Sequence, residues 1–372
     1  MITLKTVTSK SDLRAFIKFP DILYKDNKYR ATPIHRFELN TLDKKKNPAF
    51  EYCEAEYWLA YKNNEIVGRI AAIINHRFCD IWGAKNGRFG WIDFIDDEEV
   101  SKALLNQAET WLKSKGMEAI QGPLGFTDLD MEGMLVDGFN EYGTMAVIYN
   151  HAYYPQHMEK HGYQKDADWV QKELKIPKEV PEKLKKFSKI IAEKYNVHPL
   201  KVKSAKEYLP YAHSMFNTLN EAFKDLYGFV PLNEKQIEIY IKDFFSAIVP
   251  EYVCFVVNQK EEVVGFGVSM PSLTQALIKA KGNLFPKGVY YILKTLKNHD
   301  IIDMHLNGVR PDYQGKGIHS IYYAEMMQTY IDKGIKTAIT SPQLETNNRA
   351  LMLWDGYEQR DHLRRRSYIK QL

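Results

Sequence analysis

Apolar and polar residues alternate in short runs along much of the chain, and this pattern predicts β-strands. In the first part, such runs cover residues 2–7, 55–61, 66–74, 88–95 and 168–176. Two of them are joined by Lys-Asn-Asn-Glu at 62–65, which predicts a β-hairpin. Apolar residues at helical spacing predict helices at 99–115 and 153–163. The order of these elements indicates a mixed α/β domain with a twisted sheet flanked by helices.

The same order of elements recurs after a proline-containing break at residues 177–181. Leu-Lys at 200–201 matches Leu-Lys at 4–5, and Glu-Tyr at 251–252 matches Glu-Tyr at 56–57. Gly-Tyr at 356–357 matches Gly-Tyr at 162–163, and all these offsets lie between 194 and 196 residues. So constant an offset predicts a duplicated fold. We expect a first domain at 1–176, a linker at 177–183 and a second domain at 184–372.

Composition narrows the class of protein without identifying it. The chain has 372 residues, of which 45% are hydrophobic and 26% are charged, with a formal net charge of +4. This small charge gives no reason to expect nucleic acid or a membrane as partner. Without a long apolar run or a signal-like N-terminus, we expect a cytoplasmic location. The three cysteines and 11 histidines show no metal-ligand spacing, so no metal is predicted, and the oligomeric state stays open.

A glycine-containing segment after a predicted strand is the clearest candidate for chemistry. Residues 301–308 alternate as a strand, residues 309–317 read Val-Arg-Pro-Asp-Tyr-Gln-Gly-Lys-Gly, and an amphipathic run follows from 318. Two glycines let backbone N–H groups converge beside the positive end of a helix dipole, where phosphate or pyrophosphate binds. The spacing fits neither a P-loop nor a dinucleotide-binding loop. The alternative is a plain turn between strand and helix.

This segment resembles the acetyl-CoA loop of the GNAT N-acetyltransferase superfamily, Gln/Arg-x-x-Gly-x-Gly/Ala after a strand that ends Val-x-Pro. Gln314, Lys316, Gly317 and Ile318 fit the pattern, whereas His319 stands where Gly or Ala is usual. The resemblance extends in outline over both halves and implies two tandem GNAT-like domains. It implies that acetyl-CoA or a related acyl-CoA is the co-substrate. The residues that it implies for binding are Val309, Gln314, Gly315, Lys316, Gly317, Ile318 and His319.

The first half lacks this loop. Its corresponding strand is followed by Asp-Asp-Glu-Glu at residues 96–99. Four carboxylates suit the start of a helix but would repel a pyrophosphate. We therefore expect the first domain to be a degenerate copy that does not bind CoA in the usual way.

The strand that enters the loop carries an unusual polar stripe. Because side chains along a strand alternate between its two faces, we expect one face to carry Asp303, His305, Asn307 and Val309. His305 lies where serotonin N-acetyltransferases, which this segment resembles in layout, also carry His. We predict His305 as general base, with Asp303 orienting it or sharing a water relay. The alternative is a core histidine that is hydrogen-bonded to Asp303.

A second stretch resembles the other GNAT signature, Asn-x-x-Ala-x-x-Leu-Tyr before Gly-Phe/Tyr. Asn347, Ala350 and Leu353 fit, and residues 356–357 read Gly-Tyr. The resemblance implies that Asn347 binds the pantetheine arm, although a helix cap explains it equally. Trp354 stands where a proton-donating Tyr is common, so the general acid is another residue or is absent.

The acceptor side is less readable. The resemblance places it around residues 216–231 and at the start of the second hairpin, with Asp225, Tyr227 and Tyr252 as candidate binding residues. Residues 122–149, rich in Gly, Asp and Met, form a second candidate element, and the insertion between residues 269 and 299 is a candidate lid. Three consecutive arginines at 364–366 are expected to lie on a solvated strand edge rather than to bind nucleic acid.

These observations predict an N-acetyltransferase, or a transferase of related acyl groups, that acts by direct transfer in the second domain. The acceptor is expected to be a small primary amine or amino-acid-like molecule. A non-catalytic acyl-CoA-binding protein is the alternative that the missing Tyr and His319 favour. An aminoacyl-transferring GNAT-like enzyme is a third reading, which the Gly-Lys-Gly loop opposes.

Overall fold

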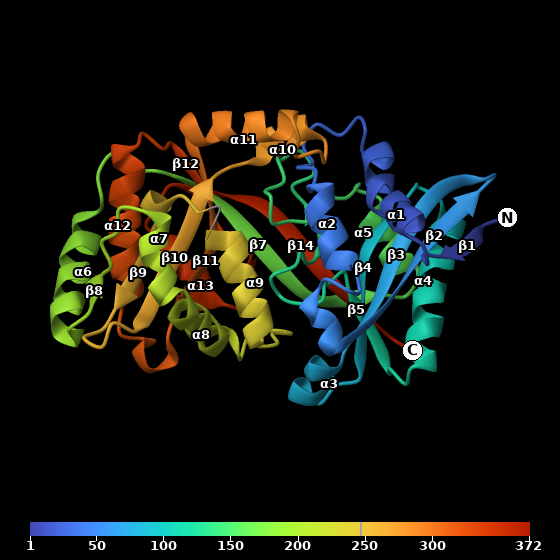
Figure 1. Cartoon of the computed structure of the whole chain (residues 1–372), viewed down its shortest axis with the longest axis horizontal. Helices are drawn as coiled ribbons and strands as arrows, with labels where there is room; N and C mark the ends of the chain where they lie inside the picture. Colours follow the sequence, from blue (N-terminus) through green and yellow to red (C-terminus); the bar gives the residue numbers. More distant parts are fainter. Residues whose placement is uncertain (246–247) are drawn as a thin grey trace.

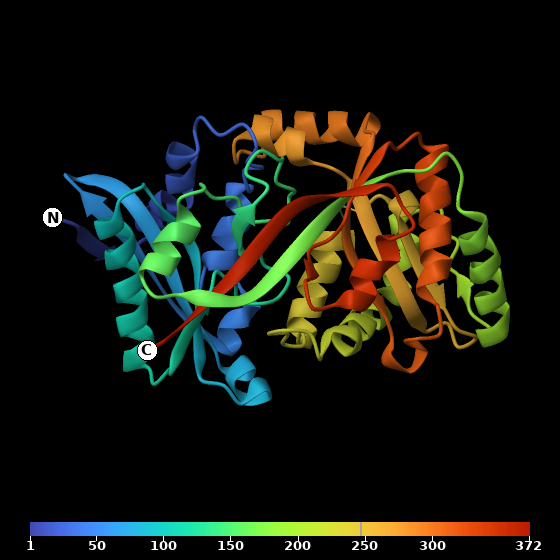
Figure 2. The same ribbon diagram turned by 180° about the vertical axis from the view of Figure 1, so that it is seen from behind.

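The computed structural model describes residues 1–245 and 248–372, and within this part the chain forms two halves that lie side by side (Figure 1). Each half contains a twisted sheet with helices on both faces, as the view from behind also shows (Figure 2). The elements of the first half are β1 (Thr3–Thr6), α1 (Lys10–Leu23), α2 (His35–Leu42), β2 (Cys53–Lys62), β3 (Glu65–Asn75), α3 (His76–Trp82), β4 (Asn86–Phe94), α4 (Glu98–Ser114), β5 (Ala119–Gly122), β6 (Met134–Asp137), α5 (Tyr154–Lys160) and β7 (Gln164–Lys175).

The second half repeats this order with additional helices. Its elements are α6 (Glu182–Tyr195), β8 (His198–Pro199), α7 (Ala205–Tyr208), α8 (Ala212–Phe223), α9 (Glu234–Phe245), β9 (Val253–Val257), β10 (Val263–Pro271), α10 (Thr274–Ala280), α11 (Lys287–Lys297), β11 (Ile301–Val309), α12 (His319–Asp332), β12 (Thr337–Ile339), β13 (Gln343–Leu344), α13 (Asn348–Leu351) and β14 (Gln359–Gln371). In both halves an antiparallel hairpin leads to a strand, a long helix and a parallel strand. The mixed α/β architecture predicted from the sequence is confirmed.

The described strands join into one continuous sheet across both halves. Its strands follow the order β1-β2-β3-β4-β5-β14-β7-β12-β11-β10-β9-β8. The last strand of each half lies against the sheet of the other half, because β14 pairs with β5 and β7 pairs with β12. β14 and β7 also pair with each other over most of their length. The halves are therefore joined by exchanged strands, while the boundaries at 176 and 184 stay a prediction.

The exchange changes the surroundings of the three arginines on β14. The strand lies between β5 and β7 rather than at an edge, and Arg365 is 1% exposed. Arg364 and Arg366 both donate hydrogen bonds to the Asp168 carboxylate on β7. The expectation of a solvated strand edge is wrong, because a strand in the middle of a sheet has neighbours on both sides.

Apolar clusters cover both faces of the sheet in each half. In the second half one cluster lies between the sheet and α12, and another lies between the sheet and α8 and α9. The first half has the corresponding pair beneath α4 and α1. Burial of these side chains is the main favourable contribution to folding, at about 25 cal/mol per Å² of apolar surface. It fixes the strand that carries the glycine loop between two packed layers.

Candidate active site

The glycine loop joins the end of β11 to the start of α12. Gly315 has φ +72° and Gly317 has φ +83°, which are backbone conformations that other residues adopt at a cost. A side chain at Gly315 would meet open space, whereas a Cβ at Gly317 would lie 2.7 Å from the Phe187 ring on α6. Gly317 is therefore required both by its φ and by the close approach of α6.

Several backbone amides of this loop point to no acceptor within the described protein. The amide of Gln314 donates to Pro311, and that of Lys316 makes a long contact of 3.3 Å with the Tyr313 carbonyl. Among residues 1–245 and 248–372, no hydrogen bond is found for the backbone amides of Gly315, Gly317, Ile318 and His319. The last of these is the first residue of a 14-residue helix, where the dipole favours an anion. The loop has the free donors that a pyrophosphate requires.

Side chains hold the loop in this shape. The side-chain amide of Gln314 donates a hydrogen bond to the Val309 carbonyl at 3.1 Å, and this bond ties the loop back to the strand. The Lys316 ammonium lies between two aromatic rings, 5.2 Å from the centre of Tyr195 and 5.0 Å from that of Tyr313. Ile318 is fully buried in the core beneath α12. The predicted loop residues are thus brought together, with Ile318 as an anchor and Lys316 as a cation beside the free amides.

Helix α6 lies against α12 and adds positive charge near the loop. The helix carries two glutamates and five lysines, which lie at positions 183, 185, 186, 189 and 194. Its Phe187 and Ile191 side chains contact the position of Gly317. Sequence reasoning did not connect this helix with the loop, because the contact joins residues that are far apart in the chain.

β11 separates from its parallel neighbour β12 soon after it begins. The two strands pair only from Ile301 with Thr337 to Asp303 with Ile339. Beyond this point β11 continues to Val309 and pairs with β10 on its other side. The strands therefore diverge toward the glycine loop, and main-chain groups of β11 face the gap.

A β-bulge on β11 disturbs the predicted polar face. The register with β10 skips His305, which is left without a partner. Before the bulge Met304 packs in the core beneath α12, but after it Leu306 packs in the core beneath α8. The prediction that Asp303, His305 and Asn307 share one face is therefore wrong, because an extra residue reverses the alternation.

Asp303 is enclosed in protein, whereas His305 is half-buried with its Nε2 atom out of contact with solvent. Asp303 is 2% exposed, and neither of its carboxylate oxygens has a hydrogen bond of normal geometry within the described chain. Burial raises the pKa of Asp303 to about 7, against a smaller opposing effect of the Ser272 hydroxyl. Burial lowers the pKa of His305 to about 4, and its Nε2 also has no partner. Unpaired buried polar groups of this kind occur at functional sites.

The second predicted signature is found on short helices near α12. The Asn347 side chain accepts a hydrogen bond from the Ala350 amide at 3.2 Å and so caps α13. Trp354 is buried, and its ring packs edge-on against Tyr323 with centroids 5.1 Å apart. Burial raises the pKa of Tyr323 well above its usual value, so its phenol stays protonated. Tyr323 is therefore a protonated phenol whose ring contacts Trp354.

The three predicted acceptor residues do not lie together. Asp225 is exposed, and Tyr227 donates to the Asp166 carboxylate at the junction of the two halves. Tyr252 is 1% exposed and its hydroxyl lies 2.7 Å from Nε2 of His299. Tyr252 belongs to the core beneath α12, so it does not share a surface with the other two.

The acidic segment within residues 122–149 lies at the junction of the halves. The Asp128 carboxylate accepts from the Val230 amide of the second half, and burial raises the pKa of Asp128 and of Asp130 to about 6. Burial also raises the pKa of Glu132, well above its ordinary value. Arg88, which is almost fully buried, donates to carbonyls of both halves and lies near these acids. Burial therefore outweighs the attraction of Arg88 and favours the protonated form of these three acids. Asp137 lies apart on β6.

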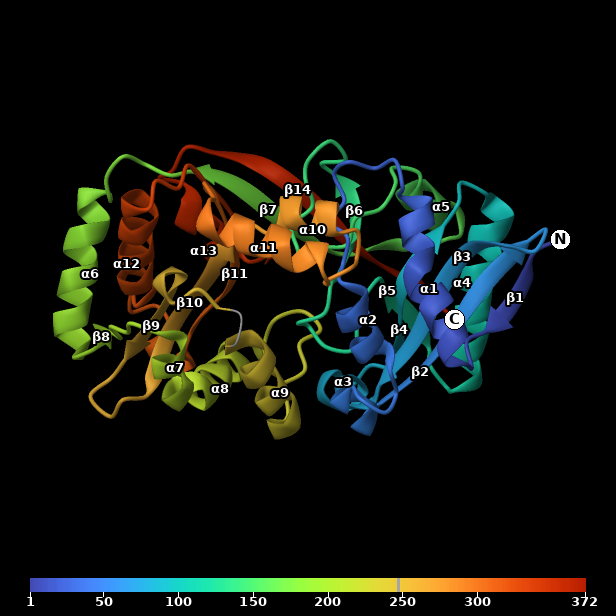
Figure 3. The ribbon, with the colours of Figure 1, turned by 45° about the horizontal axis from the view of Figure 1, so that its top comes forward.

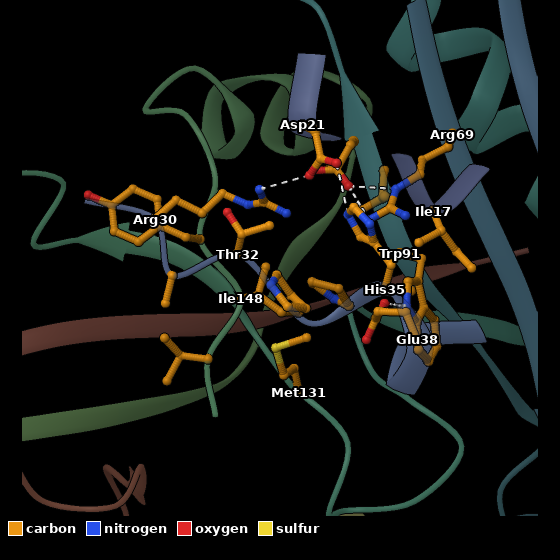
Figure 4. A pocket seen from close by; sticks show the side chains of 18 of the residues that line it. Ile17, Asp21, Arg30, Thr32, His35, Glu38, Arg69, Trp91, Met131 and Ile148 are labelled. Atoms are coloured by element: carbon orange, nitrogen blue, oxygen red, sulfur yellow. Dashed lines mark hydrogen bonds and ion pairs between the residues drawn. The ribbon is translucent and has the colours of Figure 1, made fainter. Parts of the chain in front are cut away.

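A cleft that is partly open to solvent occurs in the first half, with about 750 Å³ of empty space that includes open solvent. It lies beside β4, the strand that corresponds to β11 (Figure 4). Asp21 faces both Arg30, at 3.9 Å, and His35, at 2.8 Å. Arg69 is paired with Asp93 on the cleft wall. No sequence motif indicates this cleft, because its polar residues are scattered over several elements.

The start of α4 carries carboxylates at the place that corresponds to the glycine loop of the second half. Asp97 caps the helix by accepting from the Glu99 amide, and its other oxygen pairs with Lys62. Glu98 pairs with Lys160. Carboxylates therefore take the place beside the helix dipole that the free amides hold in the second half.

One cluster in the described part of the chain has ligand groups close enough for a metal. Oxygen or nitrogen atoms of Glu141, Glu173 and His362 all lie within 4.8 Å of one another. Arg360 donates to both carboxylates, however, and so compensates their charge. The cluster is an ion-pair network, and the expectation of no metal stays a prediction.

Known structures share this architecture over the whole chain. A tandem GNAT protein from the clavulanic acid biosynthesis pathway superposes with a TM-score of 0.56, at 11% identity, and the match covers 100% of this chain and 98% of that one. The chain is a tandem GNAT-fold protein. A GCN5-related N-acetyltransferase from Sphaerobacter thermophilus also has this fold, with a TM-score of 0.52 at 12% identity over 100% of this chain and 95% of that one. Both matches, at 11% and 12% identity, concern the fold of the chain.

Two curated proteins resemble this tandem GNAT-fold chain in sequence. Protein YghO of Escherichia coli (strain K12) is 28% identical over 379 aligned residues, covering 99% of this chain and 95% of that protein. The bacterial ceramide synthase of Caulobacter vibrioides is 27% identical over 292 residues, covering 78% of this chain and 75% of that protein. No model of a known protein family matches the chain. The helices that the structure describes are all too short or too polar to traverse a lipid bilayer.

Proposed function

We propose that this chain is an acyl-CoA-dependent N-acyltransferase whose second half binds CoA and transfers the acyl group to a primary amine. The observation that carries the proposal is the group of amides at the start of α12 that have no partner among the described residues, those of Gly315, Gly317, Ile318 and His319. These donors suit the pyrophosphate of CoA, and Lys316 supplies a positive charge beside them. The divergence of β11 from β12 leaves room for the pantetheine arm to run along β11.

The donor and the acceptor are proposed as classes. Acetyl-CoA is the smallest donor that the loop would accept. The name of the Caulobacter relative adds a second candidate, because a ceramide is a long-chain amino alcohol that carries an amide-linked fatty acyl group. We therefore extend the proposal to long-chain acyl-CoA as donor and to amino alcohols with a long apolar chain as acceptor.

The reaction needs a base to take a proton from the amine as its nitrogen attacks the thioester carbon. With a pKa of about 4, His305 is neutral at pH 7 but is a weak base. With a pKa of about 7, Asp303 is better matched to accept a proton near neutral pH. We propose that Asp303 is the base and that His305 positions the amine or a connecting water.

The thiolate that leaves needs a proton donor. Trp354 occupies the position where a proton-donating Tyr is usual. We propose the Tyr323 phenol as the donor instead, because its ring contacts Trp354 and its proton is retained at neutral pH. The collapse of the tetrahedral intermediate then breaks the carbon–sulfur bond, and sulfur takes the phenolic proton. The product amide and free CoA leave without a covalent enzyme intermediate.

The proposal is tested by the release of free CoA thiol from acetyl-, octanoyl- and palmitoyl-CoA with a panel of amines. The panel contains polyamines, amino acids and long-chain amino alcohols. Asp303→Asn is expected to lower turnover by about 10²–10⁴-fold, the range for loss of a general base, whereas His305→Ala should lower it less, because His305 only positions the amine or a water. His198→Ala, which changes an exposed histidine of the same half, is the matched control and is expected to leave turnover unchanged.

Other outcomes separate the alternatives. Binding of acyl-CoA without acylation of any amine would favour a non-catalytic acyl-CoA-binding protein, which the buried Trp354 also suits. Product formation that requires charged tRNA and proceeds without CoA would favour aminoacyl transfer. Absence of CoA binding at millimolar concentration would refute the proposed function.

A further inference from the structure

The connection between β10 and β11 has an unusual composition. These 28 residues, 272–299, which we call the strap, contain five lysines and no aspartate or glutamate. The whole chain has a formal net charge of +4, so all other residues together sum to −1. The small overall charge, from which the sequence suggested no membrane partner, conceals this local concentration.

The strap lies across both halves of the molecule. Figure 3 shows α10 and α11 along the outer surface, from the end of β10 to the loops of the first half. Its inner side chains, including Leu277 and Ile292, pack with Ala31 and Ile34 of the first half. Gly282 lies against the His35 ring, and the Gly282 carbonyl accepts a hydrogen bond from the His35 amide at 2.9 Å. The strap is therefore a fixed part of the fold.

The outer side of the strap is apolar and basic at once. Phe285, Tyr290 and Leu293 are 69%, 61% and 54% exposed. Along α11, positions 287, 290, 294 and 297 follow at helical spacing and form one outward stripe. The exposed lysines beside these apolar side chains are Lys279, Lys281, Lys287, Lys294 and Lys297.

None of these five ammonium groups has an ion-pair partner among the described residues, whereas Lys333 and Lys336, after the next strand, are paired with Glu251 and Asp300. Exposed lysines without acids attract an anionic surface, and protruding aromatic and aliphatic side chains favour the interface of a bilayer. A nucleic acid or an acidic protein would satisfy the lysines but would leave Phe285 and Leu293 without an apolar environment. We propose that the strap docks the protein on an anionic phospholipid bilayer.

The position of the strap gives this docking a consequence for the proposed function, on which this step rests. The strap begins at Ser272, two residues after Met270, which pairs with Asp303 across β10 and β11. Its middle contacts His35, which lines the cleft of the first half. Docking through the strap therefore brings the proposed base and the first-half cleft to the membrane, where amines and acyl donors with long chains are found.

The test is co-sedimentation of the full chain with vesicles of phosphatidylcholine alone or mixed with phosphatidylglycerol, at low and high salt. We expect binding to the anionic vesicles that weakens with salt. Each lysine near such a surface contributes about fivefold, so the triple variant Lys287→Gln/Lys294→Gln/Lys297→Gln should bind about a hundredfold less. Tyr290→Ser/Leu293→Ser should also lose binding.

Matched controls remove the same charge and the same apolar surface elsewhere. They are Lys44→Gln/Lys45→Gln/Lys46→Gln and Ile22→Ser/Ile81→Ser, which should bind as the unmodified chain does. Equal loss in a control, or equal binding to both vesicle types, would overturn the proposal. Binding to nucleic acid or an acidic protein without vesicle binding would overturn it too. Acyl-CoA binding is measured for every variant, so that failure of the docking proposal is distinguished from failure of the proposed function.

Discussion

Three glycines with nearly the same backbone conformation allow a sharp test of the loop. Gly315, Gly317 and Gly334 have φ values of +72°, +83° and +71°. A Cβ at Gly315 or Gly334 would meet no atom within 4 Å, whereas one at Gly317 would lie 2.7 Å from Phe187. Gly334 follows the C-terminal end of α12, away from the free amides at its start. Alanine at each position therefore separates backbone strain, steric overlap and ligand contact.

The magnitudes follow from these differences. A left-handed backbone costs a non-glycine residue about 1–2 kcal/mol, so Gly315→Ala and Gly334→Ala should lower the free energy of unfolding by about that amount. At Gly317 the overlap with Phe187 adds about 1–3 kcal/mol, for a total of about 2–5 kcal/mol. If the Gly315→Ala loop relaxes to another backbone conformation, CoA must restore it, which weakens binding by about five- to thirtyfold.

The assays are urea unfolding for stability and titration calorimetry with CoA for affinity. We expect Gly315→Ala to weaken CoA binding and Gly334→Ala to leave it unchanged, although both destabilise the protein equally. Gly317→Ala should lose both stability and binding. The reasoning about the loop is refuted if Gly315→Ala binds CoA like the unmodified chain, or if Gly334→Ala weakens binding as much as Gly315→Ala does.

Three further predictions concern titratable residues. Burial raises the pKa of Asp303, so the folded state binds the proton of this carboxyl more tightly than the unfolded state does. The free energy of unfolding should therefore fall by up to roughly 4 kcal/mol as the pH rises from about 4 to 7. In Asp303→Asn, unfolding measured across this pH range should no longer show this decrease. Tyr323→Phe should lower turnover by about 10²-fold at unchanged CoA affinity, and additional Trp354→Tyr should restore part of it; unchanged turnover would exclude Tyr323 as acid. For Asp168, burial alone would raise the pKa, but hydrogen bonds from Arg366 and Arg364 outweigh it and lower the pKa. Its contribution is therefore lost as pH falls, and Asp168→Ala should cost about 3–5 kcal/mol near neutral pH by thermal or urea unfolding; a cost below about 1 kcal/mol would contradict this.

Only part of the candidate site could be predicted from residues that are close together in the sequence. The glycines of the loop and the helix after it could be predicted, because the permissive backbone of glycine and the polarity of a helix start are properties of neighbouring residues. The loss of the predicted shared face of Asp303, His305 and Asn307 could not be predicted, because the bulge at His305 arises from the pairing of β11 with β10. The contact between Tyr323 and Trp354 likewise joins two helices that are separate in sequence.

The amino-acid sequence by itself determined the order of strands and helices, their duplication and the glycine loop, since each depends on periodicity or on residues close in the chain. Tertiary structure alone decided that β7 and β14 exchange sheets and that Arg365 is buried. Because the two halves are copies, the last strand of either half suits the edge of either sheet, and nothing in its own residues specifies the choice. Only the path of the connected chain and the packing of both halves together select the arrangement.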